Sequence, residues 1–268
     1  MSRSGYYAYV KRRERLEEVE KARKAEIKRI FDRSQGTYGP GRIVGIIRKN
    51  GGKASYKKTS RQMAEMGLKS IHNKRRTRSL TDSRKARGEG YANLVRGQDI
   101  EKRGQVVCSD ITYLKSGEGW LYLCVFKDIV TGEILGTATS QNMKKELVVQ
   151  ALLNALTRHR LKRGTIIHTD RGSQYTSEAF LEVMKRYGLV PSYSRVGMPG
   201  DNAWAESFFA TLKKERIHFE HFRTREELDL EVFAWIEGFY NSERVQARLG
   251  HLSPREYAAM LMENEEAV

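Results

Sequence analysis

The feature that most constrains the fold of this chain is a change of sequence pattern after Gly97. Beyond it, three apolar runs are separated by short glycine-containing turns, and such short connections join antiparallel strands. These strands are expected at residues 105–114, 120–128 and 133–139. Helical and strand patterns then alternate, with helices expected at 144–161, 177–187 and 202–216 and strands at 165–169 and 190–194. This order predicts an α/β fold around a mixed sheet.

The part of the chain before Gly97 has helical patterns and no strand pattern. One long charged helix is expected at residues 8–33, and shorter helices at 41–48 and 57–66 flank a glycine turn. Two helices joined by a turn, the second rich in Lys and Arg, fit a helix-turn-helix type module. Residues 73–90 are rich in charge and poor in apolar side chains, so they are expected to be a basic linker.

Charge is distributed unevenly between these two parts. Residues 1–100 hold 27 Lys and Arg against 10 Asp and Glu, a net charge of +17, and the remainder of the chain carries −1. Such a segregated positive charge favours binding to a polyanion such as nucleic acid. Charge alone does not separate an enzyme from a ribosomal or other structural nucleic-acid binding protein.

Cysteine content and hydropathy exclude several classes of protein. The two cysteines, Cys108 and Cys124, cannot form a disulfide framework and both lie in strand-like runs. The longest apolar run, Leu121 to Phe126, is far shorter than the ~18 residues of a membrane span. No apolar signal-peptide region follows Met1. We therefore expect a soluble intracellular protein without a membrane partner.

Three acidic residues occupy positions that suggest a metal site. Asp110 lies inside an apolar strand, Asp170 follows the strand at 165–169, and Glu206 lies one turn into a helix. Burying a carboxylate is costly unless it is paired or binds a cation, and carboxylate oxygens suit hard divalent cations. Taken singly, each has a plain alternative: a sheet-edge acid, an acid capping a turn, and a solvated helix residue.

The combination of motifs resembles the DDE transposases of bacterial insertion sequences, specifically the IS-three group. Glu206 follows Asp170 after 35 intervening residues, and Lys213 follows Glu206 by seven, which places both on one helix face. The matching stretches are Ser109 to Tyr113, His168 to Ser177, Asp201 to Glu215, Tyr240-Asn241 with Arg244, Leu249-Gly250 and Ser253-Pro254. The resemblance covers roughly residues 30 to 260.

The resemblance implies an α/β, RNase H-like mixed-sheet core, similar to that of retroviral integrases, preceded by a basic all-α helix-turn-helix region. It implies that Asp110, Asp170 and Glu206 are the catalytic triad and hold two Mg²⁺ ions, with Mn²⁺ as a substitute. It also implies cutting of DNA at the element ends and joining of a 3′-hydroxyl to a new phosphodiester. The domains are then a DNA-binding region with its linker (1–92), an integrase-like catalytic core with C-terminal helices (93–258) and an acidic tail (259–268).

Several basic and polar residues are candidate DNA contacts. Lys213 occupies the position at which the family contacts terminal DNA, and Arg195 opens a glycine- and proline-containing loop, residues 195–200, expected to be mobile and to admit the substrate. Arg171 and Gln174 either touch phosphate or face solvent. Lys57, Lys58 and Arg61 either meet the groove of DNA or form an ordinary solvated helix face. His168 either assists proton transfer or, as we expect, packs beside the site. Trp120, Tyr122 and Phe126 are expected to be core strand residues and not a base-stacking surface.

The expected partners are double-stranded DNA, namely element ends and target, and further copies of the chain assembled on that DNA. The chain resembles the downstream-frame product of the family, so fusion to or association with an upstream-frame DNA-binding product is expected as well. The expected location is the bacterial cytoplasm, at the nucleoid. Two rivals remain: a structure-selective nuclease that does not join strands, and a DNA-binding regulator without activity.

Overall fold

The chain divides into two compact units, which are described separately. A computed structural model describes residues 2–71, 92–159, 161–195 and 198–266. The first unit comprises Met1–Asn73 and Val245–His251, and the second comprises Lys74–Arg244 and Leu252–Val268. The expected basic linker, residues 73–90, lies outside the described residues.

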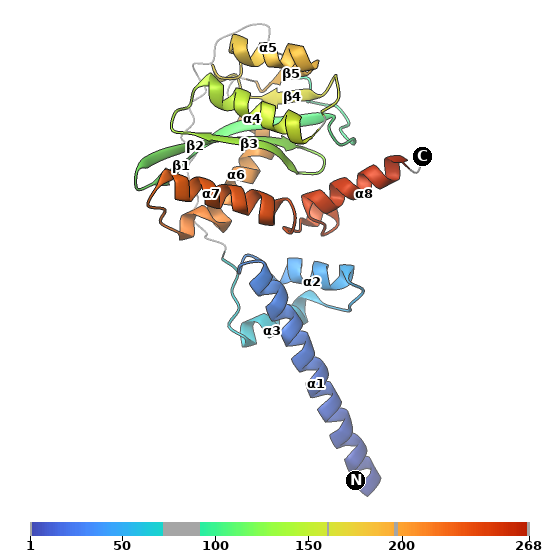
Figure 1. Ribbon diagram of the computed structural model, residues 1–268. Coiled ribbons are helices and arrows are strands. Elements are labelled where there is room, and N and C mark those ends of the chain that lie inside the picture. Colours follow the sequence, from blue (N-terminus) through green and yellow to red (C-terminus); the bar gives the residue numbers. More distant parts are fainter. Residues whose placement is uncertain (1, 72–91, 160, 196–197, 267–268) are drawn as a thin grey trace. The chain divides into compact units, whose positions relative to one another are not determined.

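The first unit is built on three helices, α1 (Arg3–Arg33), α2 (Pro40–Lys49) and α3 (Tyr56–Glu65) (Figure 1). Helix α1 begins five residues earlier than expected, because the Ser2 hydroxyl accepts the Gly5 N–H and caps its first turn. Pro40 occupies the first turn of α2, and Ser55 caps α3 by accepting the Lys58 N–H. The three expected helices of this region are therefore present.

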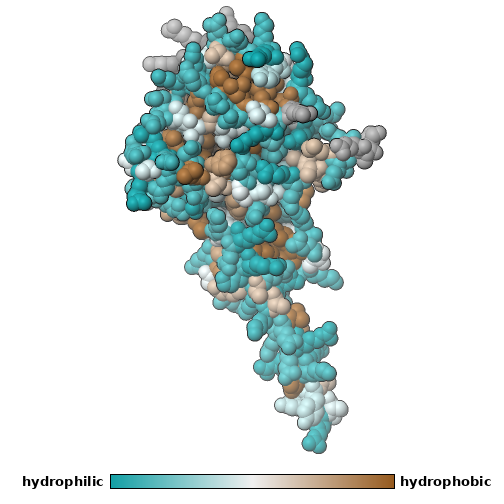
Figure 2. Space-filling view, viewed as in Figure 1, coloured by the Kyte–Doolittle hydropathy of each residue, from teal (hydrophilic) through white to brown (hydrophobic). Residues whose placement is uncertain are grey.

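A segment from near the C-terminus completes the first unit. The Tyr38 hydroxyl accepts the Val245 N–H at 2.8 Å, and Leu249 is 2% exposed. These residues join a core formed by apolar side chains of the three helices: Ile27, Ile30, Ile43, Ile47 and Met63. The N-terminal half of α1 instead exposes apolar side chains such as Leu16 and Val19. Figure 2 shows this helix as mostly hydrophilic, with a few isolated hydrophobic residues.

The second unit contains a five-stranded mixed sheet with the order β3-β2-β1-β4-β5. Its strands are β1 (Val106–Ser116), β2 (Gly119–Asp128), β3 (Ile134–Ser140), β4 (Ile166–Thr169) and β5 (Val190–Tyr193). The first three are antiparallel, and β4 and β5 are parallel to β1. Strand β4 pairs with β1 from Val106 to Cys108, and within the described ranges no other strand pairs with the rest of β1 on that side.

Helices cover the two faces of this sheet (Figure 1). Helices α4 (Lys145–Arg158) and α5 (Glu178–Tyr187) pack on one face with Val107, Phe126 and Ile167. The adjacent Cys108 points to the opposite face, where it packs with Ala205 of α6 (Ala203–Glu215). Both cysteines are free and buried.

The C-terminal helices close the second unit. Helix α7 (Arg225–Ala234) continues into a π-helical turn, η3 (Trp235–Tyr240), and α8 spans Pro254–Glu266. The segment expected to be an acidic tail is thus helical from residue 259 to Glu266. Short 3-10 turns η1 (Pro199–Asn202), η2 (Ile217–Phe219) and η4 (Ala247–Leu249) complete the chain. None of the described helices is long and apolar enough to cross a membrane.

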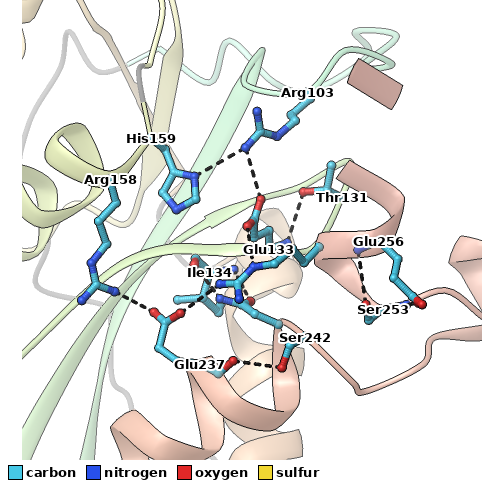
Figure 3. A network of polar contacts seen from close by, with 12 residues as sticks. Arg103, Thr131, Glu133, Ile134, Arg158, His159, Glu237, Ser242, Ser253 and Glu256 are labelled. Carbon is cyan, nitrogen blue, oxygen red and sulfur yellow. Dashed lines mark hydrogen bonds and ion pairs between the residues drawn. The ribbon is translucent and has the colours of Figure 1, made fainter. Parts of the chain in front are cut away.

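Polar contacts attach these helices to the edge strand β3. Asn241 exchanges two hydrogen bonds with the backbone of Ile134, each 2.9 Å long. Beside it, the buried Glu133 carboxylate lies between Arg103 and Arg255, and Arg255 also contacts Glu237 at 3.0 Å (Figure 3). This network fixes the last helices against the sheet.

A second buried contact explains another part of the C-terminal motif. The Arg244 guanidinium donates two hydrogen bonds to the Glu215 carboxylate, at 2.7 and 2.6 Å, and both side chains are less than 10% exposed. Removing one partner would deprive the other, a buried charge, of this ion pair, at a cost of about 3–5 kcal/mol. The motif residues Asn241 and Arg244 therefore have structural roles.

Candidate active site

Strand register brings Asp110 and Asp170 together. Cys108 of β1 lies opposite His168 of the parallel strand β4. Continuing this register by two residues places Asp110 beside Asp170, which directly follows the end of β4. Asp170 therefore lies at the carboxyl edge of its strand, where ligands bind in open α/β sheets.

The pKa of Asp110 also reflects charged groups that lie near it. Burial, and then the charges of Asp170 and Glu206, raise the pKa of this carboxyl to about 7. The Ile111 N–H, which donates to Asp110 Oδ1 at 2.8 Å, and the Lys213 ammonium both act in the opposite direction. All three acids of the expected triad thus face a common region.

Asp170 is held in a tight turn by its own loop. Its Oδ1 accepts the Gly172 N–H at 2.9 Å, which lowers the pKa of the carboxyl, whereas burial raises it more. A Cβ on residue 172 would lie 3.0 Å from this Oδ1 and 2.9 Å from the Gln174 side-chain oxygen. A glycine at this position therefore lets the loop close around the carboxylate.

Glu206 projects from the first turn of α6, on the exposed side of the helix. Ala205, Phe208 and Leu212 on the other side are buried, as expected for the face that packs onto the sheet. Burial raises the pKa of Glu206. Across the described part of the chain, no three His, Cys, Asp or Glu side chains form a ready-made metal cluster. The three carboxylates therefore lie in one region, but their side chains are not yet oriented around a common metal position.

The start of α6 is attached to three neighbouring strands. Asn202 Nδ2 donates to the Ser109 carbonyl of β1 at 3.0 Å, and Lys127 Nζ of β2 donates to the Trp204 carbonyl at 2.8 Å. His168 Nε2 of β4 donates to the Asp201 carbonyl at 3.0 Å. These contacts fix residues 201–204, directly before Glu206, relative to the strand that carries Asp110.

The sequence predicts the position of His168 beside the site but does not predict a role for Lys127. His168 is fully buried, and its Nδ1 accepts from the Ser192 hydroxyl at 2.9 Å because Nε2 is the donor, so it packs beside the site as expected. Lys127 is 5% exposed and was not among the candidate residues. The sequence feature that could have indicated Lys127 is its position directly after the apolar run of β2.

Lys213 lies between the acids and an aromatic ring. Its ammonium is 5.1 Å from the centroid of the Tyr113 ring. Burial lowers the pKa of Lys213, and the Asp110 charge raises it, so the two groups lie within electrostatic reach. Lys213 therefore borders the acidic region from the second half of α6.

Three other candidate DNA contacts are engaged with protein groups. Arg171 Nε donates to the Ser194 carbonyl at 3.0 Å, and Gln174 Nε2 donates to the Met143 carbonyl at 2.9 Å. Arg195 forms a two-point contact with Asp201, which keeps the pKa of that carboxyl well below its usual range. The expected entrance loop contains Val196 and Gly197, which lie outside the described residues.

The candidate contacts of the first unit lie on one exposed side of α3. Lys57, Lys58 and Arg61 are exposed, whereas Thr59, Gln62 and Met63 are buried. The Arg61 guanidinium is 3.6 Å from Glu65. The three basic side chains therefore point into solvent from a helix that is anchored by its other side.

The expectation that Trp120 is a core residue was wrong. Trp120 is 46% exposed, whereas Phe126 is fully buried and Tyr122 packs partly buried against the core. Trp120 lies near the turn of the β1–β2 hairpin, opposite Lys115, beyond the residues that α4 and α5 cover. The alternation of apolar side chains along β2 does not indicate how far α4 and α5 extend over the sheet.

Comparisons with known families and proteins agree with this geometry. Residues 17–76 match the HTH-like domain, and residues 101–199 and 206–262 match integrase core domains. These matches, with the sheet order, confirm the helix-turn-helix type region and the RNase H-like α/β fold.

Three relatives resemble nearly the whole chain. The transposase for insertion sequence element IS904 of Lactococcus lactis subsp. lactis (strain IL1403) is 35% identical and covers 92% of this chain and 97% of its own. Transposase InsF for insertion sequence IS3A of Escherichia coli (strain K12) is 36% identical, covering 96% and 90%. The insertion element IS600 uncharacterized 31 kDa protein of Shigella sonnei is 37% identical, covering 95% and 93%. The chain therefore belongs to the IS-three family of insertion-sequence transposases, which are polynucleotidyl transferases with an integrase-type core.

Proposed function

We propose that this transposase cuts DNA at the ends of its element and joins the freed 3′-hydroxyl to target DNA, using Asp110, Asp170 and Glu206 as ligands of two Mg²⁺ ions. The observation that carries the proposal is Asp110, a half-buried carboxylate that the strand register places next to Asp170 and whose pKa is raised to about 7 by burial and by the charges of the other two acids. Such a group of like charges calls for a cation.

The donor set fits divalent metal ions. Asp110 and Asp170 each accept one backbone N–H, which leaves further lone pairs on both carboxylates for a metal. Glu206 is exposed on α6, so its side chain can turn toward the other two acids. When bound, two Mg²⁺ ions, or Mn²⁺ in their place, would stabilise the attacking and leaving oxygens of the phosphodiester.

The residues of the chain bind and orient the DNA around this site. The Lys213 ammonium, next to Asp110, would neutralise a phosphate close to the one that is cut. The basic side of α3, with Lys57, Lys58 and Arg61, would hold the duplex as helix-turn-helix modules do. Arg171, Gln174 and Arg195 would serve as DNA contacts after releasing their present protein partners.

The proposed partners follow from this chemistry. The chain binds double-stranded DNA at element ends and at the target, in the cytoplasm at the nucleoid. Two ends must be joined to one target, which favours a homo-oligomer on DNA. Association with an upstream-frame DNA-binding product, as a fusion or as a separate chain, would add contacts to the element ends. We propose the division of labour accordingly: residues 1–92 bind DNA, residues 93–258 catalyse, and residues 259–268 are an acidic end.

Cleavage and joining are tested with duplexes that carry the ends of the element encoding this chain. Full-length protein is incubated with an end-labelled duplex in Mg²⁺, in Mn²⁺ and in EDTA, and nicked products are separated on a denaturing gel. A pre-cut duplex with a free 3′-hydroxyl is then offered with a target plasmid. Nicking and plasmid-joined products in both metals are expected, and none in EDTA.

The same assay separates the rival functions. Nicks without joined products, from a donor that already has its 3′-hydroxyl, would identify a nuclease that does not join strands. Binding without nicks or joined products would identify a regulator. Either result would contradict the proposed strand transfer.

A further inference from the structure

An exposed aromatic pair lies beside the candidate active site and has no assigned role. Tyr113 of β1 and Trp120 of β2 are in edge-to-face contact, with ring centroids 5.1 Å apart. They are 41% and 46% exposed. On the same face of the hairpin, Ile111 and Tyr122 pack against the core below α4 and α5. The aromatic pair therefore lies just beyond the part of the sheet that α4 and α5 cover.

Strand geometry places this pair close to the acids. Tyr113 follows Asp110 by three residues on β1, which corresponds to about 10 Å along a strand, and strand alternation directs the two side chains to opposite faces. Both are reached from the edge of β1 beyond Cys108, where Lys213 of α6 contacts the Tyr113 ring. A duplex strand advances by about 3.4 Å per nucleotide. A base that contacts Tyr113 would therefore lie within about three nucleotides of a phosphate bound at Asp110.

Lys213 connects the pair to the acids. Among the residues that the structure describes, no strand pairs with β1 beyond Cys108 on the side of β4. The Lys213 ammonium lies over the Tyr113 ring there and remains within electrostatic reach of Asp110. This cation–π contact holds the ring next to the expected path of the backbone phosphates. The aromatic surface is thus continuous with the candidate site.

Charge around the pair suits a nucleic acid strand. Lys115, opposite Trp120 in the hairpin, is exposed, and Arg225 Nε donates to the Trp120 carbonyl at 3.0 Å. The acid at the hairpin turn, Glu118, accepts the Arg225 N–H at 2.9 Å. Exposed aromatic rings framed by Lys and Arg are the means by which proteins bind unpaired bases, through stacking between phosphate contacts.

We propose that the Tyr113–Trp120 pair is a stacking surface for one nucleobase of the DNA, within about three nucleotides of the phosphate that is cut. This inference rests on the proposed function, because it places the bound strand at Asp110. Stacking on the pair holds the base out of the duplex and so opens the helix next to the reacting phosphate. The plain alternative is a cross-strand aromatic contact that only stabilises the hairpin.

A protein–DNA mutant cycle tests the stacking surface. Full-length Trp120→Ala and Tyr113→Ala are made in a Glu206→Gln background, so that binding is read without cleavage. Their affinity is measured for element-end duplexes, either intact or with one abasic nucleotide at each of about three positions on either side of the cut phosphate. Matched controls are Tyr187→Ala and Phe233→Ala, exposed rings (39% and 48%) that also lie near arginines.

On intact DNA each variant should bind roughly tenfold more weakly, while Trp120→Phe, Tyr113→Phe and the two controls keep their affinity. At one abasic position the parent protein should bind roughly tenfold more weakly than it binds intact DNA. The alanine variants should bind that abasic duplex as tightly as they bind intact DNA. The proposal would be overturned if, at every abasic position, the losses of DNA affinity from the substitution and from the missing base were additive. It would also be overturned if the affinity losses followed a fall in the Tm of the variants. A changed oligomeric state with unchanged DNA affinity would instead identify the pair as a contact between copies. Residual cleavage by the Glu206→Gln parent would contradict the proposed function without affecting this cycle.

Discussion

The Lys127 ammonium on β2 donates to the main-chain carbonyl of Trp204 at 2.8 Å, two residues before Glu206. Lys127 lies opposite Cys108 in the hairpin, on the strand face that α6 covers. A buried lysine is costly, and this one is used to hold the first turn of the helix that carries the third acid. It acts as a positioning residue, because it is 5% exposed and contacts the helix that carries Glu206.

Replacing Lys127 with Met should therefore weaken metal binding more than DNA binding. Methionine fills a similar volume but leaves the Trp204 carbonyl without this donor. The Mg²⁺ concentration that gives half-maximal cleavage should rise about tenfold or more, as when partners of metal ligands are removed. Equilibrium DNA affinity should stay close to that of the wild type.

A surface lysine provides the control for this prediction. Lys162→Met, in the exposed loop before β4, should leave the Mg²⁺ dependence unchanged. If Lys127→Met lowers the rate equally at all Mg²⁺ concentrations and in proportion to a loss of folded protein, Lys127 has only a structural role.

The basic side of α3 should dominate the salt dependence of binding. Replacing Lys57, Lys58 and Arg61 by Ala together should reduce the slope of log affinity against log salt by about 0.9 for each lost phosphate contact. The control removes three exposed charges from α1, with Lys11, Arg12 and Arg15 replaced by Ala. An equal change of slope in both triple variants would mean that net charge, and not α3, holds the DNA.

The ion pair between Arg195 and Asp201 should stabilise the protein only while Asp201 is ionised. The contact keeps the pKa of Asp201 well below its usual value of about 4, so its contribution is present above that pH and is lost as the pH falls toward the folded-state pKa. Asp201→Asn should lower Tm at pH 7, and the difference from wild type should shrink between pH 5 and pH 3. A difference that grows toward acid would contradict this assignment.

The two thiols should be unreactive until the second unit unfolds. Cys108 and Cys124 are 0% exposed, and burial raises the pKa of Cys124 to about 12. Mass spectrometry after treatment with an alkylating reagent at pH 8 should find both cysteines unlabelled in native protein and labelled in denaturant. Rapid labelling of either thiol without denaturant would mean that the sheet is not packed as described.

Local patterns were sufficient to predict most elements. The five strands lie within two residues of their expected ends, because apolar alternation and glycine turns are local signals. Helix α1 starts early because the Ser2 cap lies before the first apolar residue that marked the helix. Asp110 was expected inside one strand and Asp170 after another, and the parallel register of β1 and β4, continued by two residues, brings the two together.

Features that depend on distant contacts were not predictable in this way. The membership of residues 245–251 in the first unit rests on a hydrogen bond to Tyr38, more than 200 residues away in sequence. The role of Lys127 depends on where α6 packs, and the exposure of Trp120 depends on where α4 and α5 end. None of these leaves a periodic signal in the sequence.

Glu206→Gln tests the central claim most directly. Glutamine keeps the shape of the side chain and removes its charge, and burial already disfavours the charged form of Glu206, so the fold and DNA affinity should be unchanged. The matched control is Glu182→Gln, on the exposed side of α5. With element-end duplexes in Mg²⁺, Glu206→Gln should bind as the wild type does and yield neither nicked nor joined products, while the control yields both. Nicking and joining by Glu206→Gln at the wild-type rate would contradict the assignment of Asp110, Asp170 and Glu206 as the catalytic site.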